Sequence, residues 1–247
     1  MSRRMLVNPE TVETKLVTTE DFPLLDRAYA EIYLPAFPKA DQRESLADLK
    51  RYIQHNSSTE EYQILITQHT SPAGYQRPLS IATANYLSDS EITIAFFEYA
   101  AVHPSYQGQG LWGSITKART RFVEEKAKEL NTTLAAVFTE TEKPHLFGRM
   151  KFSDDPNDTY YHLDFDYVQL PVRDDAQPVH NLALLARFAP EEREQYLHGG
   201  IPSELMLRCL HLYFNSFEVE YDYREHPGYK QMEEEIKQSN IRLLKLG

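Results

Sequence analysis

The stretch VHPSYQGQGLWGSITKAR, residues 102–119, contains three of the chain's nine glycines, Gly108, Gly110 and Gly113. A strand-like segment precedes these glycines, and apolar residues recur at helical spacing after them. The first N–H groups of a helix lack intrahelical partners and carry partial positive charge, and glycine lets an anion approach them closely. The stretch therefore predicts a phosphate-binding turn at a helix N-terminus. A tight turn that needs glycine only for its backbone angles is the alternative.

Two better-known phosphate-binding patterns do not fit this stretch. The glycine spacing satisfies G-x-G-x-x-G, but no Lys-Ser or Lys-Thr follows the second glycine, which excludes a P-loop. A dinucleotide-binding fingerprint belongs to a βαβ unit near the start of a parallel sheet, whereas three predicted strands come before this turn. We therefore exclude the Rossmann interpretation as well.

Composition and charge limit the partners of the chain. Its 247 residues are 41% hydrophobic and can form a large core, while the formal net charge of -11 argues against a nucleic-acid partner. No apolar run approaches the roughly 20 residues that span a bilayer, and the first residues lack a signal-peptide pattern. The single Cys209 predicts a buried thiol in a reducing compartment. We expect a cytoplasmic protein without a membrane partner.

The order of predicted elements indicates a mixed α/β domain, residues 1–189, followed by a helical C-terminal extension, residues 190–247. A strand at 13–17 and helices at about 19–33 and 46–53 come first. Segments within 62–70, 78–87 and 91–102 predict an antiparallel meander. The helix at 111–130 follows, closed by Asn131 in the left-handed conformation. Strands at 134–140, 160–170 and 181–188 and a short helix at 143–150 complete the domain.

A known family shares both the motif and this order of elements. The strand AFFEYAAV, then His103-Pro104, then QGQGL (107–111) opening an amphipathic helix, resembles the acetyl-CoA-binding motif of the GNAT acyltransferase superfamily, Gln/Arg-x-x-Gly-x-Gly/Ala. The resemblance covers about Glu13 to Phe188. It implies a GNAT acyl-CoA N-acyltransferase core, with a sheet that mixes parallel and antiparallel strands and with acetyl-CoA as the acyl donor.

The resemblance also implies which residues bind the cofactor. Backbone amides from about Gln107 to Gly113 would bind the pyrophosphate, and the pantetheine arm would lie along the strand that ends at Val102, where it splays from residues 134–140. A backbone amide near Ala101 or Val102 would stabilise the oxyanion. The expected cofactor-binding residues are Ala101, Val102, Gln107, Gly108, Gln109, Gly110, Leu111, Trp112 and Gly113.

The sequence departs from the family pattern at two places. Trp112 stands where the last glycine or alanine is expected, and we predict that its indole points away from the phosphates and packs. In HLFGRMKF, residues 145–152, Phe147 and Lys151 replace the tyrosine and glycine of the family segment Leu-Tyr-x-x-x-Gly-Phe. Phe147 cannot protonate a leaving thiolate, so the usual acid is missing or has moved. Replacement donors are Tyr99, Tyr160, Tyr161 and His145.

Glu98 is the candidate general base. An alkylammonium must lose a proton before it attacks a thioester, and Glu98 lies in an otherwise apolar strand just before the glycine turn. Its alternative role is that of an outward-facing strand residue or the partner of a cation elsewhere. Glu98 and Tyr99 form the predicted catalytic pair.

Four residues are predicted to contact the acceptor. Glu140 ends the strand at 134–140, where the substrate groove of the family opens, and Tyr29, Glu31 and Tyr33 lie near the end of the first helix, which commonly lines that groove. Carboxylates and aromatic rings suit an ammonium group through charge and cation–π attraction. The alternative is a solvated helix face with tyrosines in the core. The nine histidines show no metal-ligand spacing, so we expect no metal.

The leading hypothesis is an acetyl-CoA-dependent N-acetyltransferase that acetylates a primary amine of a small molecule or peptide by direct attack in a ternary complex. A catalytically silent acyl-CoA-binding or regulatory protein is the first alternative, because of Phe147 and Trp112. A protein N-acetyltransferase whose helical extension recruits the target is the second. A homodimer is left open.

Overall fold

The computed structural model describes residues 12–40, 43–57, 60–149, 152, 157–171, 178–179, 182–216 and 221–246. The chain forms two compact units. The first comprises Met1–Tyr86 and Phe97–Glu129, and the second comprises Leu87–Phe96 and Leu130–Gly247. Both units combine strands with helices, which confirms the predicted mixed α/β class.

The first unit is built on two long strands, β2 (Glu60–Thr70) and β3 (Gln76–Ser88), of which the last two β3 residues belong to the second unit. The short strand β1 (Val12–Leu16) pairs antiparallel with β2. On the other side, β5 (Ala100–Val102) pairs antiparallel with β3, and Ile81 lies opposite Ala101. The nearly continuous burial of β3 reflects helices on both faces of these strands.

One face of β2 and β3 is covered by the N-terminal helices. Helix α1 (Phe22–Ala28) continues through a π-helical segment (Tyr29–Tyr33) into α2 (Leu34–Ala36), and α3 (Leu46–Gln54) follows. Pro23 lies in the first turn of α1, where its missing N–H removes no helical bond. Apolar residues of these helices share a core with alternate residues of the two strands: Leu25, Ile32, Leu49, Ile64, Ile66 and Ile81.

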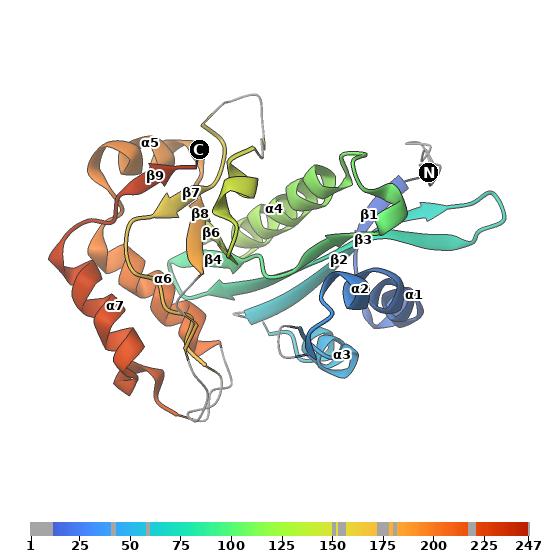
Figure 1. The fold of residues 1–247 in the computed structure, drawn as a ribbon, viewed down its shortest axis with the longest axis horizontal. Coiled ribbons are helices and arrows are strands. Elements are labelled where there is room, and N and C mark those ends of the chain that lie inside the picture. The colour runs from blue at the N-terminus through green and yellow to red at the C-terminus, as the bar shows by residue number, and fades with distance from the viewer. Residues whose placement is uncertain are drawn as a thin grey trace. The chain divides into compact units, whose positions relative to one another are not determined.

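The other face is covered by α4 (Leu111–Glu129), as Figure 1 shows. Its Ile115 packs against Leu65 and Ala82, which point to the opposite side from their neighbours in the strands. Asn131 follows with a φ of 56°, the predicted left-handed closure. The predicted helix at 111–130 is confirmed.

The second unit contains the remaining strands in the order β4-β6-β8-β7-β9. Strand β4 (Ile92–Phe96) runs parallel to β6 (Thr133–Thr141), and β6 runs antiparallel to β8 (Ala183–Arg187). Strand β7 (Tyr161–Leu163) is antiparallel to both β8 and β9 (Leu243–Lys245). A 3₁₀ segment (Pro144–Arg149) lies where a short helix was predicted.

Three helices of the second unit bury their apolar faces together with these strands. They are α5 (Pro190–Gly199), α6 (Ser203–Asn215) and α7 (Pro227–Gln238). Their buried residues form one cluster with Phe96, Phe138 and Leu184. The compact units therefore do not follow the predicted boundary between residues 189 and 190. Cys209 is buried here as predicted, and burial raises the pKa of its thiol to about 12.

The structure corrects three local predictions. The strand predicted at 160–170 is limited to Tyr161–Leu163, because the backbone turns where Phe165 donates its N–H to the carbonyl oxygen of Leu163 at 3.0 Å. The strand predicted at 91–102 is broken at Phe97–Tyr99. The extension at 190–247 is not wholly helical, since it ends in β9.

No helix in the described ranges is long and apolar enough to cross a membrane.

Candidate functional site

The backbone requires glycine at two of the three glycine positions in the turn, but not at the third. Gly108 and Gly110 have φ angles of 76° and 79°, in the left-handed region that favours glycine, so the turn itself needs them. Gly113 lies inside the first turn of α4, and a Cβ added there would meet no atom within 4 Å. The tight-turn alternative therefore explains Gly108 and Gly110 but not Gly113.

The start of α4 offers N–H donors that the helix itself does not use. The N–H of Ser114 donates to the carbonyl oxygen of Gly110 at 3.1 Å, which is the first helical bond. The N–H groups of Leu111, Trp112 and Gly113 precede it and therefore have no acceptor within the helix. They carry the partial positive charge of the helix N-terminus, which favours an anion.

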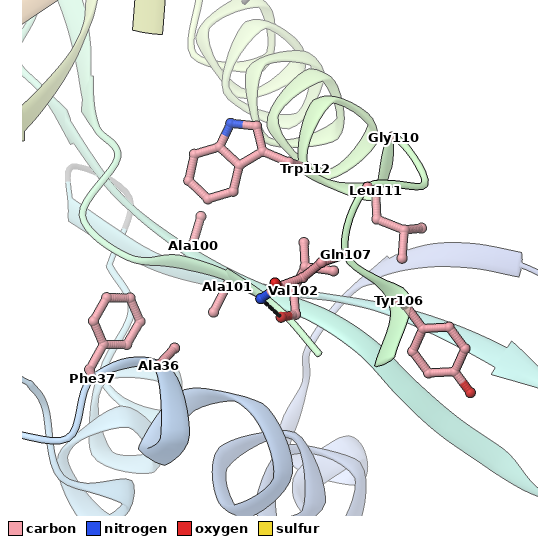
Figure 2. Close-up of a pocket in the computed structure, with 11 residues that line it drawn as sticks. Ala36, Phe37, Ala100, Ala101, Val102, Tyr106, Gln107, Gly110, Leu111 and Trp112 are labelled. Atoms are coloured by element: carbon pink, nitrogen blue, oxygen red, sulfur yellow. Dashed lines mark hydrogen bonds between the residues drawn. The ribbon is translucent and has the colours of Figure 1, made fainter. Parts of the chain in front are cut away.

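A cavity of about 520 Å³ lies between this helix start, β5 and the end of α2 (Figure 2). Residues that line it were largely predicted as cofactor-binding, and the two predicted residues outside the lining are Gln109 and Gly113. The lining residues are Ala36, Phe37, Ala100, Ala101, Val102, Tyr106, Gln107, Gly108, Gly110, Leu111 and Trp112.

Trp112 is placed differently from the prediction. Its side chain lines the cavity and is 37% exposed, whereas it was expected to point away from the bound phosphates. Figure 2 shows the indole ring next to Ala100 of β5. The reason is that the second residue of α4 projects toward β5, whose alanines leave room for a large ring.

Strand β5 turns part of its backbone toward the cavity. Thr83 donates its N–H to Tyr99 and His103 donates its N–H to Leu79, both at 2.9 Å. Hydrogen-bonded pairs alternate along an antiparallel ladder, so Ala101 between them also bonds to β3. The N–H and C=O groups of Ala100 and Val102 point away from β3. Val102, but not Ala101, therefore remains a predicted oxyanion donor, and Ala100 joins it.

Glu98 lies in the break between β4 and β5 and is half-buried. Its Oε2 accepts a hydrogen bond from the Tyr62 hydroxyl at 2.8 Å. Burial raises the pKa of Tyr62 well above its usual value, and the charge of Glu98 adds to this shift. Tyr62 therefore stays protonated as a donor and fixes the direction of the Glu98 carboxylate.

Tyr99 belongs to an aromatic cluster behind the cavity. Its ring lies 5.3 Å from that of Tyr33 and 5.1 Å from that of Phe37, and Tyr33 stacks on Tyr29 at 5.2 Å. Phe37 also lines the cavity and was not predicted as a site residue. The cluster therefore links the predicted helix residues to the cavity through Phe37 and Tyr99.

The two predicted acceptor-binding tyrosines of this cluster are core residues. Tyr33 is 0% exposed and Tyr29 is 9% exposed. The Tyr29 hydroxyl donates to the carbonyl oxygen of Glu44 at 3.1 Å, and the N–H of Glu44 donates to the Tyr33 hydroxyl at 3.2 Å. Burial raises the pKa of Tyr33 above its usual value. Direct contact of Tyr33 with a substrate was therefore a wrong prediction, whereas Glu31 is exposed.

Glu140 lies in the second unit and is enclosed by tyrosines. Its Oε1 accepts hydrogen bonds from the hydroxyls of Tyr167 and of Tyr213, the latter at 3.1 Å. Burial raises the pKa of Glu140 to about 6, although both hydrogen bonds favour the charged form. Tyr167 lines a second cavity of about 510 Å³, whose lining does not include Glu140. The prediction placed this carboxylate at an open groove. In the structure it is instead covered by the two tyrosines.

The predicted replacement acids in the second unit are also mostly buried. Tyr160 and Tyr161 are 1% and 0% exposed, and Phe147 packs against the Tyr160 ring at 5.5 Å. Both side chains therefore belong to the interior of the second unit. His145 is exposed, and Lys151 lies outside the described residues.

Arg119 was not predicted as a site residue. Its guanidinium is buried and donates to the carbonyl oxygens of Thr83 and Tyr99 at the break before β5. Its position four residues from both Ile115 and Val123 places it on the buried face of α4, which the sequence shows. A cation on an apolar helix face was the signal that could have found it.

Neither a protein-family model nor a curated protein matches the chain. Several solved structures do match the chain. An acetyltransferase of the GNAT family from Desulfovibrio desulfuricans is 12% identical with a TM-score of 0.46, over 72% of this chain and 98% of its own. The PaiA N-acetyltransferase from Thermoplasma acidophilum in complex with coenzyme A is 9% identical with a TM-score of 0.42, over 72% and 99%.

A third similar structure is an aminoglycoside acetyltransferase from an uncultured soil metagenomic sample in complex with sisomicin. It is 15% identical with a TM-score of 0.39, over 52% of this chain and 77% of its own. All three of these solved structures are described as acetyltransferases. The likeness concerns the fold.

The buried carboxylate of Glu140 predicts a pH dependence of stability. Its pKa is about 6 in the folded chain against a usual 4.5, so the folded state binds the proton more tightly than the unfolded state does. The free energy of unfolding should therefore fall as the pH rises through this window, by on the order of 2 kcal/mol. Glu140→Gln, measured by urea unfolding across the window, should remove this fall.

Glu142→Gln is the matched control, because Glu142 is exposed two residues further along the chain. It should retain the fall in stability. An unchanged pH dependence in Glu140→Gln would show that the buried carboxylate is not its source.

Proposed function

We propose that the chain is an acyl-CoA-dependent N-acyltransferase that transfers an acetyl group from acetyl-CoA to a primary amine of a small molecule or peptide. One observation carries the proposal: the N-terminus of α4 at Leu111 and the outward edge of β5 border the same cavity. Coenzyme A combines a diphosphate with an extended arm that contains amides. Both parts of the coenzyme therefore match backbone features of one cavity.

The coenzyme would bind mainly through the backbone. The pyrophosphate would accept hydrogen bonds from the N–H groups of Leu111, Trp112 and Gly113. The pantetheine arm would pair with the outward groups of Val102 as an added strand, which is how sheet edges bind extended chains. It would replace the Gln107 side chain, whose Nε2 donates to the Val102 carbonyl oxygen at 3.4 Å. Since Ala100 is further from the glycine turn along the same strand, the thioester would lie nearest Ala100.

The reaction needs a base and a stabilised oxyanion. The Glu98 carboxylate would take a proton from the acceptor ammonium, after which the amine nitrogen attacks the thioester carbon. An N–H of Ala100 or Val102 would stabilise the negative oxygen of the tetrahedral intermediate. As the C–S bond breaks, its electron pair leaves on sulfur, and the second proton of the nitrogen goes to the thiolate, with Tyr99 as the nearest predicted relay.

The acceptor is proposed to be cationic before it reacts. The formal net charge of -11 attracts cations to the protein, and the exposed Glu31 lies on the helix that leads to the cavity. Phe37, which lines the cavity, and Tyr99, which packs on Phe37, provide aromatic rings. A primary ammonium fits this combination of charge and rings.

The test is the release of free thiol from acetyl-CoA in the presence of a panel of primary amines. The wild-type chain should release thiol with at least one amine, and Glu98→Gln should lower kcat/KM by roughly 10²-fold or more. Glu125→Gln is a control, because Glu125 is an exposed carboxylate of α4 that pairs with Arg121. Equal rates for Glu98→Gln and wild type would remove Glu98 as the base.

Gly113 separates a structural from a ligand-related need for glycine. Since a Cβ at Gly113 meets no protein atom, Gly113→Ala should stabilise the fold, on the order of 0.5 kcal/mol. The added methyl group should instead weaken CoA binding about tenfold or more if the phosphates lie there. Thermal unfolding and calorimetric titration with CoA measure the two effects.

Gly199→Ala is the matched control for this substitution. Gly199 ends α5 in the second unit, and a Cβ there also meets no atom within 4 Å. It should leave CoA affinity unchanged. Unchanged affinity in Gly113→Ala would place the phosphates elsewhere.

A second candidate function is a catalytically silent acyl-CoA-binding protein, and the position of Trp112 favours it. The indole lies in the cavity next to Ala100, where the proposed thioester would have to fit (Figure 2). Tight CoA binding without thiol release from any amine would support this function. The variant Trp112→Ala then decides whether the indole ring is the cause of the missing thiol release.

In the proposed enzyme, the indole packs on the pantetheine arm. Trp112→Ala should therefore weaken CoA binding several-fold, with kcat largely retained, as measured by calorimetry and by thiol release at saturating acetyl-CoA. A gain of turnover in a silent wild-type chain would instead show that the ring blocks the thioester.

A further inference from the structure

Arg119 is a buried cation with its hydrogen bonds directed at one place in the chain. Its side chain on α4 is 3% exposed. Nη1 donates to the carbonyl oxygen of Thr83 at 3.0 Å and to that of Tyr99 at 3.3 Å, and the guanidinium carbon lies 4.1 Å above the Phe97 ring. Burying a guanidinium is costly unless such partners are present. All of these partners surround the break that precedes β5.

Arg119 replaces the last rung of the ladder between β3 and β5. Thr83 and Tyr99 continue the alternation of hydrogen-bonded pairs, in which each residue normally donates to the other. Thr83 donates its N–H to Tyr99 at 2.9 Å, but Tyr99 donates its N–H to the Thr83 hydroxyl at 3.2 Å. The Thr83 carbonyl is thereby left for Arg119. The strand leaves the ladder at the point where the guanidinium enters.

The Tyr99 carbonyl and the Ala100 N–H belong to one planar peptide group and point in opposite directions. Two donors, the Thr83 N–H and Arg119, hold the carbonyl oxygen on the β3 side. The Ala100 N–H is therefore fixed on the opposite side, and Ala100 lines the cavity. A charged donor on the carbonyl also polarises the peptide group, which strengthens its N–H as a donor.

We propose that Arg119 is a positioning residue that orients and polarises the Ala100 N–H as the oxyanion donor of the cavity. This inference rests on the proposed acyl transfer for its role in catalysis. In that reaction, negative charge appears on the thioester oxygen as the amine nitrogen bonds to the carbonyl carbon. A stronger and fixed N–H lowers the energy of that state more than it lowers the energy of the bound thioester.

The test combines kinetics with the amide signal of Ala100. Arg119→Met keeps an unbranched apolar stem but removes the guanidinium with its charge and donors. In protein labelled with ¹⁵N-alanine, it should shift the Ala100 amide proton resonance upfield, because the peptide group is less polarised. It should lower kcat about tenfold, less than the loss of a whole oxyanion donor. KM for acetyl-CoA and the Kd of CoA should stay within about twofold, because the ground state lacks the oxyanion.

Two further variants act on the same contact. Arg119→Lys keeps the charge and should restore part of kcat and of the Ala100 shift. Thr83→Val removes the hydroxyl that accepts the Tyr99 N–H while keeping the side-chain volume, and it should shift the Ala100 amide resonance. Its readout is this resonance and not kcat, because the hydroxyl also bonds to Tyr62 beside Glu98. These two variants carry the test if Arg119→Met does not fold, as judged by circular dichroism.

Arg121→Met is the matched control. Arg121 is two residues further along α4, pairs with Glu125 at 3.6 Å and is 64% exposed. It should leave the Ala100 resonance, kcat and KM unchanged. A folded Arg119→Met with an unchanged Ala100 resonance, or with unchanged kcat, would overturn the inference.

The proposed function and this inference fail in different ways. A wild-type chain that neither binds CoA nor releases thiol removes the acyl-transfer function and with it the catalytic role of Arg119. A wild-type chain that turns over, with kcat of Arg119→Met reduced only in proportion to the folded fraction, removes the inference alone. The Ala100 resonance decides in either case whether Arg119 holds the peptide group.

Discussion

Backbone donors that the secondary structure does not use are the feature on which the site depends. The first N–H groups of α4 precede its first helical bond, and β5 uses only one of its two edges for pairing with β3. Such groups are costly to bury without partners, so they face solvent or a ligand. Here both sets border one cavity of about 520 Å³. A ligand with a diphosphate and an extended amide chain satisfies both.

The side chains around the cavity keep these backbone groups in place. Gly108 and Gly110 supply the left-handed angles that bring the chain from β5 into α4. Arg119 and Thr83 end the ladder at Tyr99, and Tyr62 orients Glu98 within the break. The chemistry proposed for the site thus depends on few reactive side chains. It depends more on contacts that fix the direction of peptide groups.

The sequence predicted the elements whose signals are local. The glycine turn and α4 follow from glycine spacing and from a helical repeat, and the left-handed Asn131 follows from its place after the helix. The break at Phe97–Tyr99 could not be predicted, because apolar and aromatic residues continue on both sides of Glu98. The buried Arg119, which bonds to the Tyr99 carbonyl oxygen at the break, is 20 residues away from Tyr99 in the chain.

Predictions about side chains failed where burial depends on distant partners. Glu140 is enclosed by Tyr167 and Tyr213, which are 27 and 73 residues away, and no local pattern indicates this. Tyr33 was placed at a groove from its position in the helix, but its hydroxyl bonds to the backbone of Glu44. Trp112 was expected to point away from the phosphates and pack. This prediction failed because the small residues of β5 beside the ring are known only from the fold.

Trp112 is the chain's single tryptophan and lines the cavity, so its fluorescence reports on this site alone. The most direct measurement is therefore a titration of the wild-type chain with CoA, followed by tryptophan emission and by calorimetry in parallel. The account predicts a saturable change in emission with the same Kd as the calorimetric binding. Calorimetric binding of CoA without any change in Trp112 emission, or no binding at all, would contradict it.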